Sequence, residues 1–149
     1  MVKGRYARAL VHALMVAGLA LPGSGGVARA EVTLFENLGS LHHQITNNSD
    51  LAQKFFDQGL RLVYAFNHEE AIAAFTEASR LDPDAPMPYW GVALSLGPNI
   101  NAAMDPKVEP RAVEAVQKAT ARLSQATARE RVYVEALAAR YSAKKSVTR

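Results

Sequence analysis

Apolar residues recur through much of this chain at the spacing of an amphipathic helix. The first such stretch runs from about Asp50 to Ala65, after a polar run at 47–50 whose side-chain oxygens suit a helix start. Its apolar face carries Leu51, Phe55, Leu62 and Phe66. Gly59 lies on the same side, which lets another backbone approach closely. The pattern therefore predicts a first helix that packs against a neighbour.

A second helix is expected directly after the turn at 66–68. Asn67 followed by Glu70 is typical of a capping box, in which each side chain accepts a hydrogen bond from the other residue's N–H. Pro83 ends the helix because it cannot continue one. The predicted inner face is made of small and aromatic side chains: Ala71, Ala74, Phe75 and Ala78.

A looser copy of this pair follows. Asp84 is the expected cap of a third helix, with Pro86 and Pro88 in or near its first turn and 97–98 at its end. After a long connection over 97–109, Pro110 opens a fourth helix. Its apolar face repeats that of the second helix, with valine in place of phenylalanine: Ala112, Val116 and Ala119.

A fifth helix is predicted after a second capping box, formed by Thr127 and Glu130. Its apolar positions are Val134, Leu137, Ala138 and Tyr141. Val132, Leu137 and Tyr141 are expected to leave apolar surface that requires another neighbour. Either the chain belongs to a longer repeat array, in which case this part alone is expected to self-associate, or the last helix serves as the terminal cap of the array.

The order Phe55, Gly59, Ala71, Phe75, Ala78, Pro83 resembles the tetratricopeptide repeat, a helix–turn–helix of about 34 residues. The resemblance implies an all-α fold, a short solenoid of about two and a half repeats over 49–83, 84–124 and a partial 125–149. The runs 56–75, 81–101 and 130–142 are similar to the start of a group of exported bacterial tetratricopeptide-repeat proteins. Some relatives in that group carry a cysteine pair where this chain has Ala85 and Pro88.

Residues 31–48 form a lead-in segment with a less regular pattern. Leu34, Leu38, Leu41 and Ile45 fall at helical spacing, and Gly39 interrupts it. Either a short helix or an ordered lead-in packed on the first repeat fits this pattern.

Residues 1–30 have the three zones of a secretory signal peptide. A basic start precedes the short apolar run 9–21, and Ala28-Arg29-Ala30 fits the cleavage rule, so cleavage is expected after Ala30. An uncleaved anchor is the alternative. We therefore expect a periplasmic or secreted protein that does not touch the membrane once the signal is removed.

Charge and composition exclude several function classes. Four of the 17 basic residues and none of the 14 acidic ones lie in residues 1–30, so residues 31–149 carry a formal charge of −1. The basic balance thus belongs to the signal, and nucleic-acid binding is not expected. The absence of cysteine excludes disulfides and thiolate chemistry. Because nucleophile–base and phosphate-loop motifs are also absent, no enzyme and no cofactor are predicted.

The predicted function is binding of a peptide or protein partner in a concave aromatic groove. The resemblance implies that the first helix of each pair lines such a groove. Aromatic residues and methionine are common anchors at interfaces. The candidate residues are Gln53, Phe56, Leu60, Tyr64, Met87, Trp90 and Leu94. The same residues could instead form core against the lead-in segment.

Two alternative functions remain. Histidine with carboxylate suits Zn²⁺, Cu²⁺ or Ni²⁺, and a metal site could involve His42, His43 and His68, although their spacing matches no known ligand pattern. The chain could also be the N-terminal part of a larger solenoid with no site of its own. In the connection over 97–109, Asn99, Asn101 and Asp105 offer oxygen ligands or, more simply, turn chemistry.

Overall fold

The computed structural model describes residues 32–142, which form five α-helices and no strand. The expected signal peptide and residues 143–149 lie outside the described residues. The helices are α1 (Asp50–Tyr64), α2 (His68–Leu81), α3 (Pro86–Leu96), α4 (Glu109–Thr120) and α5 (Ala128–Ser142). The all-α fold class is therefore confirmed. No helix in this part of the chain has the length and apolar character needed to cross a membrane.

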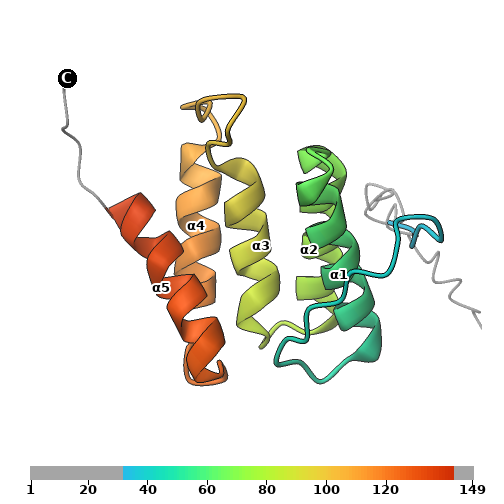
Figure 1. The fold of residues 1–149 in the computed structure, drawn as a ribbon. Coiled ribbons are helices and arrows are strands. Elements are labelled where there is room, and N and C mark those ends of the chain that lie inside the picture. Colours follow the sequence, from blue (N-terminus) through green and yellow to red (C-terminus); the bar gives the residue numbers. More distant parts are fainter. Residues whose placement is uncertain (1–31, 143–149) are drawn as a thin grey trace, which may run out of the picture. The chain divides into compact units, whose positions relative to one another are not determined.

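Each helix packs against the next one along the chain (Figure 1). A turn at 65–67 joins α1 to α2, so these two helices run antiparallel. The third helix, α3, contacts all four of the others and lies at the centre of the packing. This central position explains why it buries residues around much of its circumference, from Met87 to Leu96.

Local chemistry sets the helix starts, in part as predicted. Ser49 caps α1, since its Oγ accepts a hydrogen bond from the Ala52 N–H at 3.2 Å. The predicted capping box before α5 is confirmed: the Thr127 N–H donates to Glu130 Oε2 at 2.7 Å, and the Glu130 N–H donates to Thr127 Oγ1 at 3.2 Å.

Of two other predicted caps, one is at the predicted position without its bond and the other is wrong. Asn67 precedes α2 but makes no side-chain capping bond, and its ψ of 71° differs from the extended conformation of a capping residue. Ala85, not Asp84, occupies the cap of α3, with Pro86 at the first helical position.

The core is built around Phe75, whose side chain is fully buried. A Cβ atom added to Gly59 of α1 would lie 2.7 Å from the Phe75 ring, and one added to Gly91 of α3 would lie 2.5 Å from it. The two glycines therefore let α1 and α3 close on the ring from both sides. Ala71, Ala74 and Ala78 are also fully buried, as predicted.

The predicted apolar face of α1 is correct only in its middle. Phe55 and Leu62 are buried, but Leu51 and Phe66 are 44% and 54% exposed. Phe66 lies beyond the helix with a φ of 59°, so the helical spacing does not hold there.

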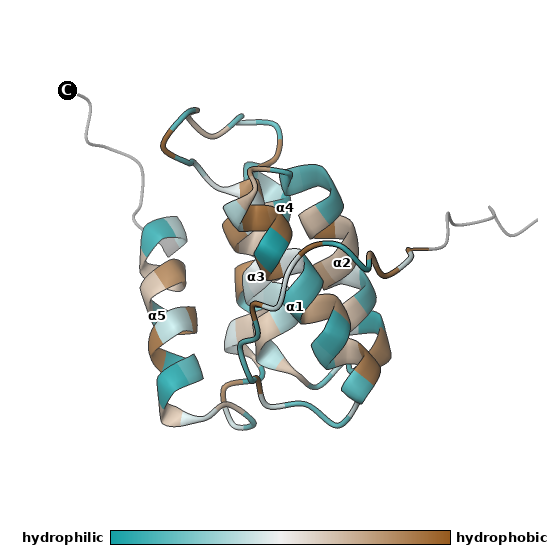
Figure 2. Ribbon diagram, turned by 45° about the vertical axis from the view of Figure 1, so that its right-hand side comes forward, coloured by the Kyte–Doolittle hydropathy of each residue, from teal (hydrophilic) through white to brown (hydrophobic). Residues whose placement is uncertain are grey.

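The lead-in segment is not a helix. Residues 32–48 lie extended along α1 (Figure 1), with hydrophobic and hydrophilic positions interspersed (Figure 2). Gly39 has a φ of +78°, which favours glycine, and Leu34 and Leu41 are exposed while Ile45 is buried. The helical alternative is wrong, and the ordered lead-in packed on α1 is confirmed.

The last helix leaves less apolar surface than predicted. Leu137 is buried, and the Tyr141 hydroxyl donates to the Ala93 carbonyl at 2.8 Å. Val132 remains 64% exposed.

Candidate functional site

Four polar side chains of α1 face the lead-in segment and form what we call the polar stripe: Gln53, Asp57, Gln58 and Arg61. Gln53, Asp57 and Gln58 are only 9%, 7% and 3% exposed. Buried polar groups require hydrogen-bond partners, and here the partners come mainly from the lead-in backbone.

The two glutamines pair with the lead-in segment in the same way. Gln58 Oε1 accepts from the Phe35 N–H at 2.7 Å, and Gln58 Nε2 donates to the Thr33 carbonyl at 2.9 Å. Gln53 Oε1 accepts from the Ile45 N–H at 3.0 Å, and its Nε2 donates to the His43 carbonyl at 2.9 Å. Each carboxamide thus bonds a C=O and the N–H two residues later. A residue in a neighbouring parallel strand would make the same pair of bonds.

Asp57 and Arg61 extend this pairing. Asp57 Oδ1 accepts from the His43 N–H at 3.0 Å and from Gln53 Nε2 at 3.1 Å. Arg61 Nε donates to the Leu41 carbonyl at 2.7 Å. The polar stripe therefore holds main-chain atoms of the lead-in segment over most of its length.

Lead-in side chains also contact the polar stripe: Gln44 Nε2 and Asn47 Nδ2 each donate to Gln53 Oε1 at 3.1 Å, and His42 pairs with Asp57. His42 Nδ1 lies 2.7 Å from Asp57 Oδ2. The hydrogen bond to Asp57 and the charge of that carboxylate raise the pKa of His42 above its ordinary value. The protonated imidazole therefore strengthens the attachment of the lead-in segment to α1.

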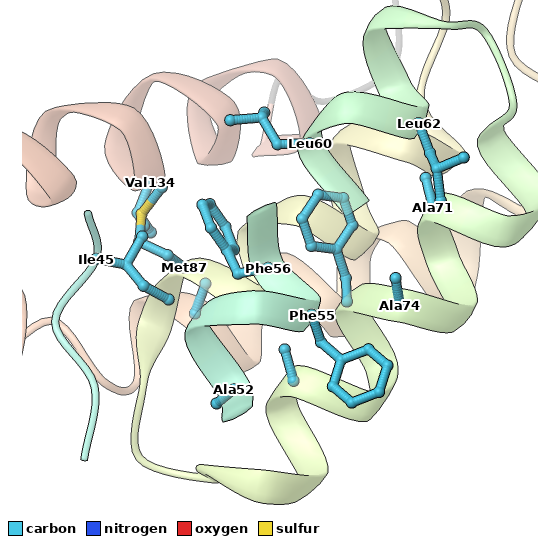
Figure 3. Packing of buried hydrophobic residues seen from close by; sticks show 13 residues of the cluster. Ile45, Ala52, Phe55, Phe56, Leu60, Leu62, Ala71, Ala74, Met87 and Val134 are labelled. Atoms are coloured by element: carbon cyan, nitrogen blue, oxygen red, sulfur yellow. The ribbon is translucent and has the colours of Figure 1, made fainter. Parts of the chain in front are cut away.

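The end of the lead-in segment is anchored in the core and on α5. Ile45 is 3% exposed and lies beside Val134 of α5 and Met87 of α3 (Figure 3). Next to it, the Thr46 N–H donates to Glu130 Oε1 at 2.6 Å and the Thr46 hydroxyl donates to Glu130 Oε2 at 2.7 Å. The segment thereby bridges α1 and α5.

Glu130 combines this anchor with the cap of α5. Burial alone would raise the pKa of Glu130, but the hydrogen bonds donated by Thr46 and Thr127 outweigh it and hold the pKa below its ordinary value. A charged carboxylate is therefore built into the contact between the lead-in segment and α5.

An aromatic pocket lies where α1, α3, α5 and the lead-in segment meet. It has a volume of about 80 Å³ and is lined by His43, Phe56, Leu60, Tyr64, Met87, Trp90 and Tyr133. The Trp90 and Tyr133 rings are 5.8 Å apart between centroids, and Trp90 Nε1 donates to the Tyr133 carbonyl at 3.1 Å. The His43 ring lies 6.1 Å from that of Tyr133 and 6.3 Å from that of Phe56.

Five of the seven predicted groove residues line the aromatic pocket, but they differ in accessibility. Phe56 and Met87 are 0% and 1% exposed and form its floor, and Leu60 is also buried. Trp90 is half-buried, whereas Tyr64 is 70% exposed. A partner could therefore touch the rim residues directly, while the floor supports them.

The other two predicted groove residues lie elsewhere. Gln53 holds the lead-in segment, as described above. Leu94 packs with Ala93 and Val116 in a second apolar cluster between α3 and α4.

Sequence reasoning did not single out Tyr133, Asp57 or Gln58, and it predicted Glu130 only as a helix cap, not as an anchor of the lead-in segment. The signal available was a row of polar residues beside the apolar face of the first helix, at positions 53, 57, 58 and 61.

The three histidines considered as metal ligands have different surroundings. His42 bonds Asp57, His43 borders the aromatic pocket, and His68 packs edge-on to Phe66 with its Nε2 at 3.4 Å from Asn99 Nδ2. Among the described residues, no group of three or more His, Cys, Asp or Glu side chains could hold a metal ion.

The connection before α4 organises its own turns. Asn99 Oδ1 accepts from the N–H groups of Asn101 and Ala102 at 2.8 and 3.1 Å, and Asp105 Oδ1 accepts from Lys107 at 2.9 Å. These oxygens act in turn formation, the simpler of the two predicted roles.

A larger hollow of about 430 Å³ lies between α4 and α5. Its lining is mostly apolar: Val113, Val116, Gln117, Thr120, Ala121, Ala138 and Tyr141.

Comparisons with models of protein families, with curated proteins and with solved structures return no match.

Proposed function

We propose that this chain is an exported, tetratricopeptide-like helical-repeat scaffold that binds a peptide or protein partner at the aromatic pocket. The observation that carries the proposal is the convergence of Tyr64, Trp90 and Tyr133, from three different helices, on one apolar hollow. Tyrosine and tryptophan are the side chains that most often dominate binding at protein interfaces.

The dimensions of the pocket favour a side chain of a larger partner over a small molecule. Sites for drug-sized ligands measure about 300 to 1,000 Å³. The aromatic pocket measures about 80 Å³ and is open at Tyr64 and Tyr133, which are 70% and 38% exposed. An apolar or aromatic side chain of a peptide fits this chemistry.

The repeat character of the proposal rests on packing as well as spacing. The small residues Gly59, Ala71 and Ala78 are buried where a tetratricopeptide repeat requires close helix contacts. Phe75 occupies the space between two consecutive first helices, α1 and α3.

Selection from a peptide library tests the proposal. The mature chain, residues 31–149, would be used to select peptides, whose affinities would then be measured by calorimetry against wild type and the Tyr133→Ala variant. We expect peptides with apolar or aromatic anchors that bind Tyr133→Ala at least about tenfold more weakly, as loss of a central anchor predicts. Gln125→Ala, in the turn before α5, is the matched surface control. Peptides that bind Tyr133→Ala and wild type equally would contradict the proposal.

The hollow between α4 and α5 favours a second candidate, a purely structural role in a larger solenoid. Its apolar lining could receive a further helix, from this chain or from another copy. Sedimentation of the mature chain would show a concentration-dependent dimer that Val113→Glu, on the lining, abolishes. A monomer at all concentrations would remove the self-association expected of this candidate.

A further inference from the structure

We propose that the polar stripe of α1 is a site that binds the backbone of an extended peptide, and that the lead-in segment is its intramolecular occupant. The partner in trans would be an extended peptide that replaces residues 33–46 and carries an aliphatic residue at the position of Ile45. This inference rests on the proposed function, because it specifies the conformation of the partner and the surface along which it lies.

The hydrogen bonds identify the type of ligand. The stripe bonds the lead-in segment at six main-chain atoms: Thr33 O, Phe35 N, Leu41 O, His43 N, His43 O and Ile45 N. Three side chains add to these bonds: His42 pairs with Asp57, and Gln44 and Asn47 each donate to Gln53 Oε1 at 3.1 Å. Main-chain atoms are common to all peptides, so the six main-chain bonds select an extended backbone whatever its sequence.

The burial of lead-in side chains shows where sequence does matter. Leu34, Phe35 and Leu41 are 38%, 44% and 45% exposed. Ile45 is 3% exposed in the core cluster. Ile45 is therefore the one fully buried apolar side chain of the described segment; Val32 and Leu38 are partly buried against the core cluster, whereas Leu34, Phe35 and Leu41 are replaceable.

The occupant and the aromatic pocket are connected through His43. Its main-chain atoms bond Gln53 and Asp57, while its ring borders the pocket against Phe56 and Tyr133. Displacement of the lead-in segment would therefore remove one wall of the pocket. An extended peptide in trans would bind along the polar stripe and reach the aromatic residues together.

A tethered occupant competes at a high effective concentration. The wild-type chain should therefore bind such a peptide weakly, and variants that loosen the lead-in segment should bind it more tightly. Ile45→Ala removes most of the core anchor. Thr46→Ala removes only the hydroxyl bond to Glu130 and is the milder variant for the case that Ile45→Ala does not fold.

The probe is a fluorescent synthetic peptide of residues 32–48, titrated into the mature Ile45→Ala chain and followed by anisotropy. N-methylation of the peptide at Phe35 and Ile45 removes the two N–H groups that donate to the glutamine side-chain oxygens. We expect it to weaken binding about tenfold or more, the effect of losing two hydrogen bonds. The control peptide is methylated at the Gln44 nitrogen, whose N–H makes no hydrogen bond among the described residues. This peptide should bind as the parent does.

In the Ile45→Ala chain, where the lead-in segment competes least, Gln53→Leu and Gln58→Leu should each weaken binding of the peptide, while Gln117→Leu on α4 makes the same change away from the site and should not. Equal affinity of the parent peptide and the peptide methylated at Phe35 and Ile45, or no binding to either loosened variant, would overturn the inference.

The same titration separates this inference from the proposed function. If the glutamine variants lose binding and Tyr133→Ala does not, the polar stripe is the site and the aromatic pocket is not. If Tyr133→Ala loses binding and methylation has no effect, the pocket stands and the inference fails.

Discussion

At the scale of single residues, Phe75 shows how packing determines which residue types the helices carry. Its ring fills the space between α1 and α3, and that space exists only because positions 59 and 91 are glycines. Glycine within a helix costs about 1 kcal/mol relative to alanine. Here the cost is offset by the burial of the aromatic ring, which removes a large apolar surface from water.

Gly91→Ala should therefore destabilise the protein despite its better helix propensity. Overpacking of a core costs about 1 to 3 kcal/mol, which exceeds the propensity gain of about 1 kcal/mol. Urea unfolding should show a net loss of up to about 2 kcal/mol, and the penalty should shrink in a Phe75→Leu background. An equal effect of Gly91→Ala in both backgrounds would show that the ring is not the cause.

His42 should make the attachment of the lead-in segment depend on pH. The pKa of His42 is raised in the folded protein by Asp57, so its contribution is fully present below the unfolded pKa and is lost as pH rises through the folded pKa. The groups that face it are Asp57, Gln44 and Arg61; of these only the arginine opposes the rise in the His42 pKa, and desolvation opposes it as well.

The matched variant is His42→Gln, which keeps a hydrogen-bond donor but does not titrate. Wild type should be the more stable protein below pH 6.5, the ordinary value, and the difference should vanish above the raised pKa. Because other ionisable groups are common to both chains, a difference that stays constant across this range would exclude His42 as the titrating group.

The residues that could be predicted from sequence are those whose role depends on their own helix. The buried alanines of α2 follow from spacing alone. The capping bond predicted for Asn67 does not form, because the preceding Phe66 takes a positive φ and the backbone enters α2 at an unusual angle.

At the scale of elements, the lead-in segment is the part that spacing could not predict. Its leucines repeat like those of a helix, yet its main-chain N–H and C=O groups bond side chains of α1 instead of each other. The extended conformation of the segment depends on the polar stripe, which lies several residues away in sequence. Periodicity within the segment carries no information about such a partner.

Glu130 connects the lead-in segment to α5, and two substitutions separate its two roles. Thr127→Ala removes only the capping hydroxyl and should cost about 1 kcal/mol. Glu130→Ala removes the cap and also the acceptors of the Thr46 N–H and hydroxyl, so it should cost about 3 kcal/mol. Equal losses of unfolding free energy in the two variants would mean that the bridge to the lead-in segment contributes nothing.

Glu130 should also make the bridge sensitive to acid. Its pKa lies below the ordinary value of 4.5 in the folded protein, so its contribution is present above that value and is lost as pH falls through the lower folded pKa. The stability difference between wild type and Glu130→Ala should therefore decrease on acidification.

At the scale of the whole described unit, helix packing and the proposed binding surface are parts of the same arrangement. The helices place the Trp90 and Tyr133 rings beside each other, and the lead-in segment adds His43 to the same pocket. Five residues that line the pocket were expected on the first helix of each pair because of the resemblance to tetratricopeptide repeats. The sequence did not predict Tyr133, since the contact with Trp90 depends on how α5 packs against α3.

Hydrogen exchange of residues 31–149, with and without a library-selected peptide, tests most directly whether the polar stripe binds an extended peptide. Bound peptide should lower the protection of the Phe35, His43 and Ile45 amides, because their acceptors on α1 are taken by the peptide, while α1 itself stays protected. Peptide binding that leaves the lead-in amides fully protected would contradict the account.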